Sequence, residues 1–212
     1  MDPLDAVGVR VLGSLIEKEF TTPDTYPLTL NALTAACNQT TNREPVMTLD
    51  ESTVAKSIDD LTRRGLVREV HRSDSRAKRW RQTLSEKLSL HQAETAVMCV
   101  LMLRGPQTTG EIKTRTQRLF NFNDLAQVDI TLRALMDLST PLAIELPRQP
   151  GQKEVRFAHL LAGEPDITAI PQTEPPAAKS NRVDALEAEM AALRSEMAEL
   201  KARFDEFRRE FQ

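Results

Sequence analysis

Apolar residues in the first 85 positions recur in an order that predicts three helices followed by a hairpin. Spacing of three or four residues runs from a cap at Asp2 and Pro3 to Phe20, and it returns in two later stretches. Two shorter stretches of β-like composition, joined by a polar turn, come next. The predicted elements are helices over 3–20, 29–37 and 50–64 and strands over 66–71 and 78–84. This order is typical of a winged helix, in which the hairpin forms the wing.

The same order of elements returns between residues 86 and 162. We expect Ser89–Gln92 and Thr108–Glu111 to be capping boxes that open two helices. The two halves share little letter-for-letter identity, so the repeat is one of architecture. The sequence therefore predicts a mainly α fold with small β-hairpin wings (α+β), made of two tandem winged-helix domains at 1–85 and 86–162. The remaining predicted elements are a helix over 124–138, with Leu125, Val128, Leu132 and Leu135 inward, and a hairpin over 142–146 and 154–159.

The end of the chain differs in composition from both halves. Four prolines and almost no apolar periodicity between residues 163 and 180 predict a flexible linker. From Val183 to Phe211 apolar residues are spaced alternately three and four apart, which predicts a coiled-coil helix over 181–212 and a homo-oligomer. A single helix packed on its own domain is the alternative, and the flanking charges leave parallel and antiparallel pairing open. The intervening seam residues are Leu186, Met190, Leu193, Met197, Leu200, Phe204 and Phe207.

The composition excludes several classes of protein. No apolar run reaches the length of a membrane span and the first residues lack the layout of a signal peptide, so we expect a cytoplasmic protein. Cys37 and Cys99 lie in apolar helical stretches and are expected to be buried thiols rather than metal ligands. The sequence has no Gly-rich phosphate loop, HExxH motif or nucleophile elbow, and its three histidines are far apart. We therefore expect no enzyme activity, no metal and no cofactor.

Positive charge is concentrated in the first hairpin, although the whole chain carries a net charge of −3. Residues 61–82 hold eight basic residues and only two acidic ones. Cations on one edge displace counterions from a duplex, so we expect this wing to contact the phosphates of double-stranded DNA. A solvated hairpin whose charges protect a sheet edge is the alternative. The candidate contacts in the wing are Arg68, Arg72, Arg76, Lys78, Arg79 and Arg81.

The third predicted helix of the first half is the element that a winged helix places in the major groove. With its apolar residues inward, Ser52, Lys56 and Arg63 turn outward, where they suit contacts with phosphates and base edges. Asp59 and Asp60 oppose such contacts, and a merely solvated helix face is the alternative. The predicted function is that of a DNA-binding transcriptional regulator or nucleoid-associated protein.

Trp80 is the only tryptophan in the chain. Alternation along its strand groups it with Leu84, opposite Arg79 and Arg81. Both base stacking and a place in the core fit this position, and burial preference favours the core.

The second half exposes a different third helix. Its wheel turns Ile130 and Arg133 outward, on a face that is poor in hydrogen-bond donors. Such a face fits contact with another protein, as in scaffolds built from winged helices. A protein–protein adaptor without DNA binding is therefore the alternative function.

Three segments of the chain resemble a known family. GSLIEKEFTTPDTYPLTLNALTAACNQTTNREPV at 13–46 is similar to a motif of the YceH-like proteins of bacteria. RGPQTTGEIKTRTQRLFNFNDL at 104–125 and LPRQPGQKEVRFAHLL at 146–161 resemble the second half of that family. The resemblance covers about residues 4–162 and implies two winged-helix domains in tandem. It implies no reaction.

Overall fold

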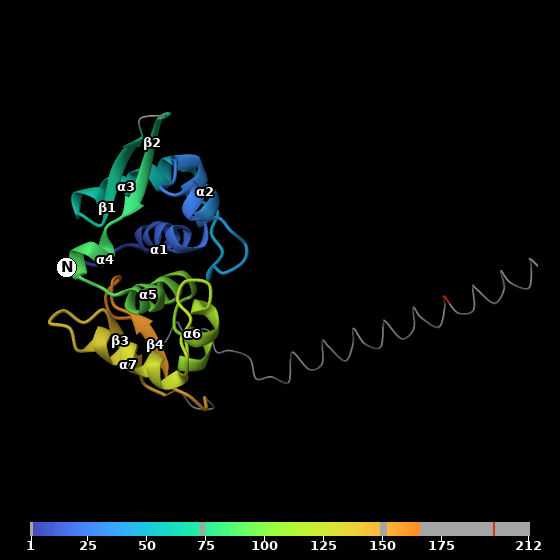
Figure 1. Cartoon of the computed structure of the whole chain (residues 1–212), viewed down its shortest axis with the longest axis vertical. Helices are drawn as coiled ribbons and strands as arrows, with labels where there is room; N and C mark the ends of the chain where they lie inside the picture. Colours follow the sequence, from blue (N-terminus) through green and yellow to red (C-terminus); the bar gives the residue numbers. More distant parts are fainter. Residues whose placement is uncertain (1, 73–74, 149–151, 166–196, 198–212) are drawn as a thin grey trace, which may run out of the picture. The chain divides into compact units, whose positions relative to one another are not determined.

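The computed structural model describes residues 2–72, 75–148, 152–165 and 197, with the side chains of residues 72, 75 and 76 left out. Within this part the chain has seven α-helices, one 3₁₀ turn and two two-stranded antiparallel hairpins. The α+β class with helices dominating is thus confirmed. In Figure 1 one hairpin lies at the top of this part of the chain, and the other lies among the helices of the lower half. Residues 2–165 lie in one compact unit.

The first half contains three helices and a hairpin in the predicted order. Each helix begins at a side-chain cap, since Asp5, Thr29 and Asp50 accept hydrogen bonds from backbone N–H groups three residues further on. The cap predicted at Asp2 and Pro3 is wrong, because the chain before Asp5 is held instead by the Leu4 N–H, which donates to the Leu161 carbonyl at 2.7 Å. The elements are α1 (Ala6–Thr21), the 3₁₀ turn η1 (Pro23–Thr25), α2 (Leu30–Cys37), α3 (Glu51–Arg63), β1 (Val67–Arg72) and β2 (Ser75–Gln82).

A short extended segment between α1 and α2 joins the first hairpin. Leu28 and Trp80 form an antiparallel bridge, with N–H to carbonyl distances of 3.1 and 2.8 Å. The hairpin is therefore extended by a third segment that precedes α2 in the chain. Its own register pairs Val67 with Gln82 and Glu69 with Trp80.

The second half repeats this arrangement. Gln107, between the first two helices of this half, bridges Phe157 with N–H to carbonyl distances of 3.0 and 2.8 Å. The hairpin pairs Ala143 with His159 and Leu146 with Arg156. The elements are α5 (Gln92–Arg104), α6 (Thr109–Thr116), α7 (Leu125–Met136), β3 (Ala143–Leu146) and β4 (Arg156–His159).

The connection between the halves differs from the sequence prediction. The strand predicted over 78–84 ends at Gln82, and Leu84 begins α4 (Leu84–Leu88). Thr83 turns the chain, because its N–H donates to the Leu66 carbonyl at 2.8 Å and its hydroxyl donates to the Gly65 carbonyl at 3.0 Å. The wholly buried Leu84 then faces the core from a helix.

One of the two predicted capping boxes is confirmed. Thr108 caps α6, with its hydroxyl accepting from the Glu111 N–H and the Glu111 carboxylate accepting from the Thr108 N–H. The box predicted at Ser89 is wrong. Ser89 has a φ of 54° and ends α4, so it cannot start the next helix. The first residue before α5 is His91, whose N–H donates to the Glu94 carboxylate at 2.7 Å.

The two halves share one continuous hydrophobic core, in which α1 packs against α5. All residues from Thr95 to Leu103 are buried, so α5 is covered on every side. The Cys99 thiol donates to the Gly13 carbonyl at 3.5 Å, and both predicted buried free thiols, Cys37 and Cys99, are confirmed. No helix in the described ranges is long and apolar enough to cross a membrane.

Candidate nucleic-acid interface

The outward face of α3 carries the side chains that the helical wheel predicts. Ser52, Lys56 and Arg63 are exposed, while Val54, Ile58 and Leu61 are buried. The face is not purely basic. It also exposes Glu51 and Asp59, and Asp60 binds Arg63 at 3.2 Å. The helix therefore offers alternating charges at its surface.

The hairpin beside α3 adds two exposed cations. Arg68 is exposed on β1, and the Lys78 side chain on β2 is 66% exposed. Lys78 makes an ion pair of 3.2 Å with Glu69, which leaves it accessible, since a surface pair of this kind is weak. Both cations are free to reach a phosphate without breaking a buried contact.

Two of the predicted wing arginines are engaged by acceptor groups of the protein itself. The Arg79 guanidinium donates to the Pro27 carbonyl at 2.9 Å. Arg81 makes a two-pronged ion pair with Glu86, at 2.5 and 3.0 Å, and this pair raises the pKa of Arg81 and lowers that of Glu86. In the sequence the six wing cations look alike. In the structure the Pro27 carbonyl and the Glu86 carboxylate accept hydrogen bonds from these two.

The other predicted wing cations lie outside what the structure describes. The side chains of Arg72 and Arg76, near the tip of the hairpin, belong to this group. Their role stays a prediction.

Trp80 belongs to the core side of the hairpin, as burial preference favours. Its side chain is partly buried and packs against the hydrophobic core. The neighbouring Gln82 is buried and donates to the Glu19 carboxylate at 2.6 Å, while its backbone N–H donates to the Tyr26 hydroxyl at 2.7 Å. Burial raises the pKa of Tyr26. These contacts fix the base of the hairpin to the end of α1.

The outward face of α7 differs from that of α3. Ile130 is 68% exposed and Arg133 is exposed, as the helical wheel predicts. Leu125 was predicted to face inward, and this is wrong, because it is 49% exposed. It is the first residue of α7, one position after the Asp124 cap, where the helix has not yet reached the core. The face therefore carries two large exposed apolar side chains.

A buried charge network in the first half was not predicted from the sequence. The Arg43 guanidinium is fully buried and binds both carboxylate oxygens of Glu17, at 3.1 and 2.5 Å. Burial by itself would raise the pKa of Glu17, but the hydrogen bonds and charge of Arg43 lower it. Arg10, also buried, donates to the carbonyls of Cys37 and Pro45 at 3.0 and 2.5 Å. The signal was the position of Arg10, a charge at a core-facing position of an apolar helix.

This network holds the long loop between α2 and α3 in place. Asn38 supports the same loop, since its amide exchanges two hydrogen bonds of 2.8 Å with the backbone of Leu49. Arg43 and Arg10 are structural residues in this arrangement.

The predicted coiled-coil seam falls almost entirely outside the described residues. Met197 alone is described, as a helical residue with 71% of its surface exposed. The remaining seam predictions are not covered: Leu186, Met190, Leu193, Leu200, Phe204 and Phe207.

Comparison with known proteins decides the family. Residues 4–152 match the family described as "Protein of unknown function, DUF480". The chain belongs to this family. A UPF0502 protein of Geobacter sulfurreducens is 52% identical over 217 aligned residues, covering 99% of this chain and 98% of the relative. UPF0502 proteins of Solibacter usitatus and Vibrio campbellii are 48% and 46% identical, covering 99% and 89% of this chain and 98% and 90% of theirs. The resemblance to the YceH-like proteins, which are the DUF480 and UPF0502 proteins, is thereby confirmed.

Proposed function

We propose that each half of this DUF480 protein is a winged helix and that the first half binds double-stranded DNA through α3 and the β1–β2 hairpin. The observation that carries the proposal is the repeated topology. In both halves a segment between the first two helices bridges the second strand of a hairpin that follows the third helix. A three-helix unit with an added small antiparallel sheet is the architecture of a winged helix.

The charges of the first half support a DNA partner. Four cations are exposed on α3 and on the hairpin next to it. They are Lys56 and Arg63 on α3, Arg68 on β1 and Lys78 on β2. Lysine and arginine side chains that neutralise phosphates supply most of the sequence-independent affinity for a duplex. The exposed acids Glu51 and Asp59 reduce this affinity. Because the expected contacts are with phosphates, we expect binding to weaken steeply as salt is added.

The test is to change Lys56, Arg63, Arg68 and Lys78 together to Ala and to titrate a duplex at several salt concentrations. Because these side chains make no buried contact, the fold should stay intact by circular dichroism. Affinity should fall across all sequences, and the log–log salt slope should flatten by roughly 0.9 per lost phosphate contact.

A matched control changes four cations of the second half to Ala: Lys113, Arg133, Arg148 and Lys153. This variant loses the same charge, so an equal loss of affinity would mean that net charge alone, and not the α3 surface, governs binding. A wild-type protein that binds no duplex at low salt would overturn the proposal.

The second half supports a separate role in binding a protein. Leu125 and Ile130 are exposed on α7, and a groove of about 420 Å³ lies between α7, the start of α6 and the β3–β4 hairpin. Met136 and Phe157 contribute apolar surface to this groove, and Asp129 contributes charge at its edge. An apolar groove with polar edges is the form of a peptide-docking site. We propose a binding role rather than catalysis for this half as well.

We also propose that residues 183–211 associate into a coiled coil. The support is the heptad spacing alone, which is sustained over four repeats. Truncation after Ala178 should leave a folded protein, since residues 2–165 lie in one compact unit with its own core. Light scattering should then show a fall in mass to that of a monomer, whereas a full-length protein that is already monomeric at micromolar concentration would rule the coiled coil out.

A further inference from the structure

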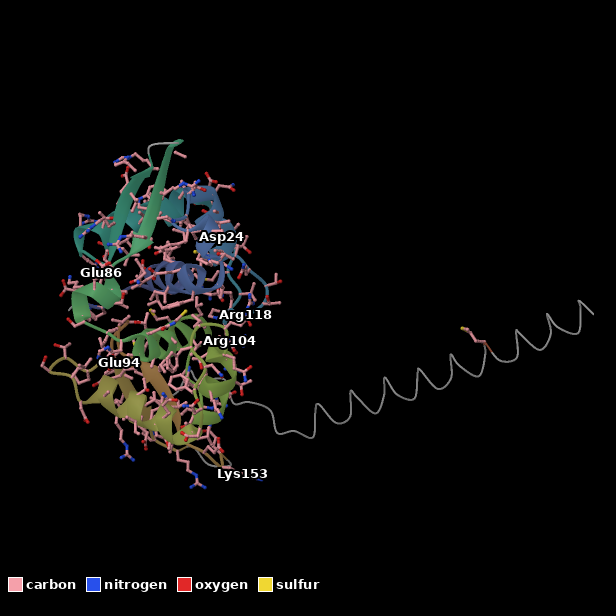
Figure 2. The ribbon with its side chains drawn as sticks, viewed as in Figure 1. Asp24, Glu86, Glu94, Arg104, Arg118 and Lys153 are labelled. Atoms are coloured by element: carbon pink, nitrogen blue, oxygen red, sulfur yellow. The ribbon has the colours of Figure 1, made fainter. Side chains whose placement is uncertain are left out.

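A cleft lies where the two halves meet, on the side of the molecule that carries the α2–α3 loop. Two adjoining cavities, of about 430 and 300 Å³, are both lined by Glu17, Thr21, Asn42 and Arg118. The first extends along the α2–α3 loop, and the second extends along α5 and α6. Figure 2 shows Arg104 and Arg118 near each other at this junction. Cavities of this size are typical of sites for small ligands.

Positive charge dominates the lining of the cleft. Lys18, Arg104, Arg115 and Arg118 line it, against the single carboxylate of Glu17. That carboxylate is already engaged by the buried Arg43 at 2.5 Å and by Lys18 at 3.5 Å. The lining therefore has a surplus of cations that its own acid does not neutralise.

Two arginines of the lining, Arg104 and Arg118, make no ion pair with a carboxylate in the described residues. Arg104 donates to the neutral side-chain oxygen of Asn42. The Arg118 residue is exposed, and its side chain makes no hydrogen bond or ion pair with any residue in the described ranges. Arg115, on α6, makes an ion pair with Glu111 at 3.3 Å. Two guanidinium groups are thus available to a ligand in one concave place.

The electrostatic environment of Arg104 agrees with this picture. Burial lowers its pKa, and the charge of Arg115 lowers it further, although Glu17 and Glu44 act in the opposite direction. A guanidinium group stays protonated in such a site, so the repulsion between Arg104 and Arg115 destabilises the protein when no ligand is bound. An anion between Arg104 and Arg118 would remove this cost.

The lining comes from two segments that are far apart in sequence. Lys18, Thr21 and Asn42 lie in 13–46, and Arg104 and Arg118 lie in 104–125, the two segments that carry most of the resemblance to the family. The buried pair of Arg43 and Glu17 holds the loop that bears Asn42. The network described above therefore has a second consequence, because it shapes one wall of the cleft.

We propose that this cleft binds a small phosphorylated ligand. The guanidinium groups of Arg104 and Arg118 would bind the phosphate, with Thr21 and Asn42 at the edge of the cleft. Arginine forks match the oxygens of phosphate in geometry and charge. None of these residues belongs to the α3 and hairpin surface proposed for DNA, so the ligand site does not depend on that proposal. A duplex backbone offers the same phosphate chemistry, and the test separates the two sources.

The experiment uses full-length protein and inorganic pyrophosphate as the probe, measured by calorimetry at constant ionic strength. Arg118→Gln should weaken pyrophosphate binding about tenfold or more, since it removes charged hydrogen bonds from an exposed side chain that the fold does not need. Arg133→Gln, the same change on the distant face of α7, should leave the affinity unchanged. Arg104→Gln should weaken pyrophosphate binding like Arg118→Gln. Because Arg104 also contacts Asn42, its loss could unfold the protein, and Arg118→Glu then serves as the second variant.

Three outcomes would overturn the proposal. The first is that the wild-type protein gives no more binding heat with pyrophosphate than with sodium chloride at equal ionic strength. The second is that Arg118→Gln and Arg118→Glu both bind pyrophosphate as tightly as the wild-type protein. In a parallel arm with a short DNA duplex, a loss of duplex binding in Arg118→Gln without a loss of pyrophosphate binding would assign the cleft to the DNA backbone. The two proposals are tested separately. If the variant with Lys56, Arg63, Arg68 and Lys78 changed to Ala binds DNA like the wild-type protein, the pyrophosphate result still stands.

Discussion

The two halves of the protein place the same elements in the same order, but they stabilise and expose them differently. In the first half α3 turns Ser52 and Lys56 to solvent, and in the second half α7 turns Ile130 and Leu125 to solvent. The buried charged residues within the described ranges, Arg10 and Arg43, both belong to the first half. Similar topology therefore supports two different surfaces.

The halves also differ in the chain that joins their second and third helices. In the first half this loop runs from Asn38 to Asp50 and is tied to α1 through Arg43 and Arg10. In the second half the corresponding chain is shorter, from Gln117 to Asp124, and the apolar residues Leu119 and Phe122 anchor it in the core. A long polar loop needs buried hydrogen bonds to hold it, whereas a short apolar one is held by burial.

The largest expected effect is the loss of this loop anchor. Arg43→Met leaves the partly buried Glu17 carboxylate without its main partner and removes the buried hydrogen bond to the Ala36 carbonyl, so the free energy of unfolding should fall by about 3 kcal/mol. Urea unfolding measures the change. Arg133→Met, an exposed arginine of the second half, should change stability by less than about 0.5 kcal/mol. Similar midpoints for the two variants would mean that the first half does not depend on its buried charges.

A second prediction concerns the contact that the halves share. A Cβ atom at Gly13 would lie 2.9 Å from Leu103 Cδ2 and 3.3 Å from Met102 Cβ, so either the Leu103 side chain would have to shift or α1 and α5 would have to separate. Gly13→Ala should therefore cost about 1–3 kcal/mol in thermal or urea unfolding.

Gly110→Ala is the matched control for Gly13→Ala. Gly110 lies in α6, and its nearest neighbour to an added Cβ is the Thr108 hydroxyl at 3.9 Å. The extra methyl group should be neutral or stabilising by up to about 1 kcal/mol. An equal loss of stability in both variants would show that the close approach of α1 and α5 at Gly13 does not explain the result.

A third prediction uses the contrast between two histidines in the hairpins. His71 is 83% exposed, whereas His159 is partly buried, and burial lowers the pKa of His159 to about 4 from a usual value of 6.5. The unfolded chain takes up a proton below pH 6.5 and the folded protein does not, so stability is lost as the pH falls from 6.5 towards 4. His159→Gln should remove about 1–2 kcal/mol of this pH dependence.

The control for the third prediction is His71→Gln in the first hairpin. Its ring is in solvent, so the curve of unfolding free energy against pH should match that of the wild-type protein. A His159→Gln curve parallel to wild type between pH 6.5 and 4 would contradict the expected role of burial.

The smallest expected effect on stability is at Ile130. Ile130→Asp should change the free energy of unfolding by less than about 0.5 kcal/mol, because the side chain is exposed and opposite the buried face of α7. Ile58→Asp, on the buried face of α3, should prevent folding. If Ile130→Asp unfolds the protein as well, the distinction between the two third helices is wrong.

Much of the fold was predictable from the sequence because periodicity reports local structure. The spacing of Val54, Ile58 and Leu61 predicts both the helix and its buried face, and the capping box at Thr108 predicts where α6 begins. The exposure of Ile130 and Lys56 followed from the same helical wheel. These features depend on residues within a few positions of one another, so no distant contact is needed to predict them.

Only the tertiary structure decided which charges are available and where the halves meet. Arg79 and Arg81 look like the other wing cations in the sequence. The Pro27 carbonyl and the Glu86 carboxylate engage them, because the segment after η1 bridges β2 and because α4 follows β2 directly. Arg43 looks like a loop residue and is wholly buried against Glu17, which precedes it by 26 positions. Hydrogen bonds and ion pairs act over a few ångströms in space, and separation along the chain does not reveal which groups will come that close.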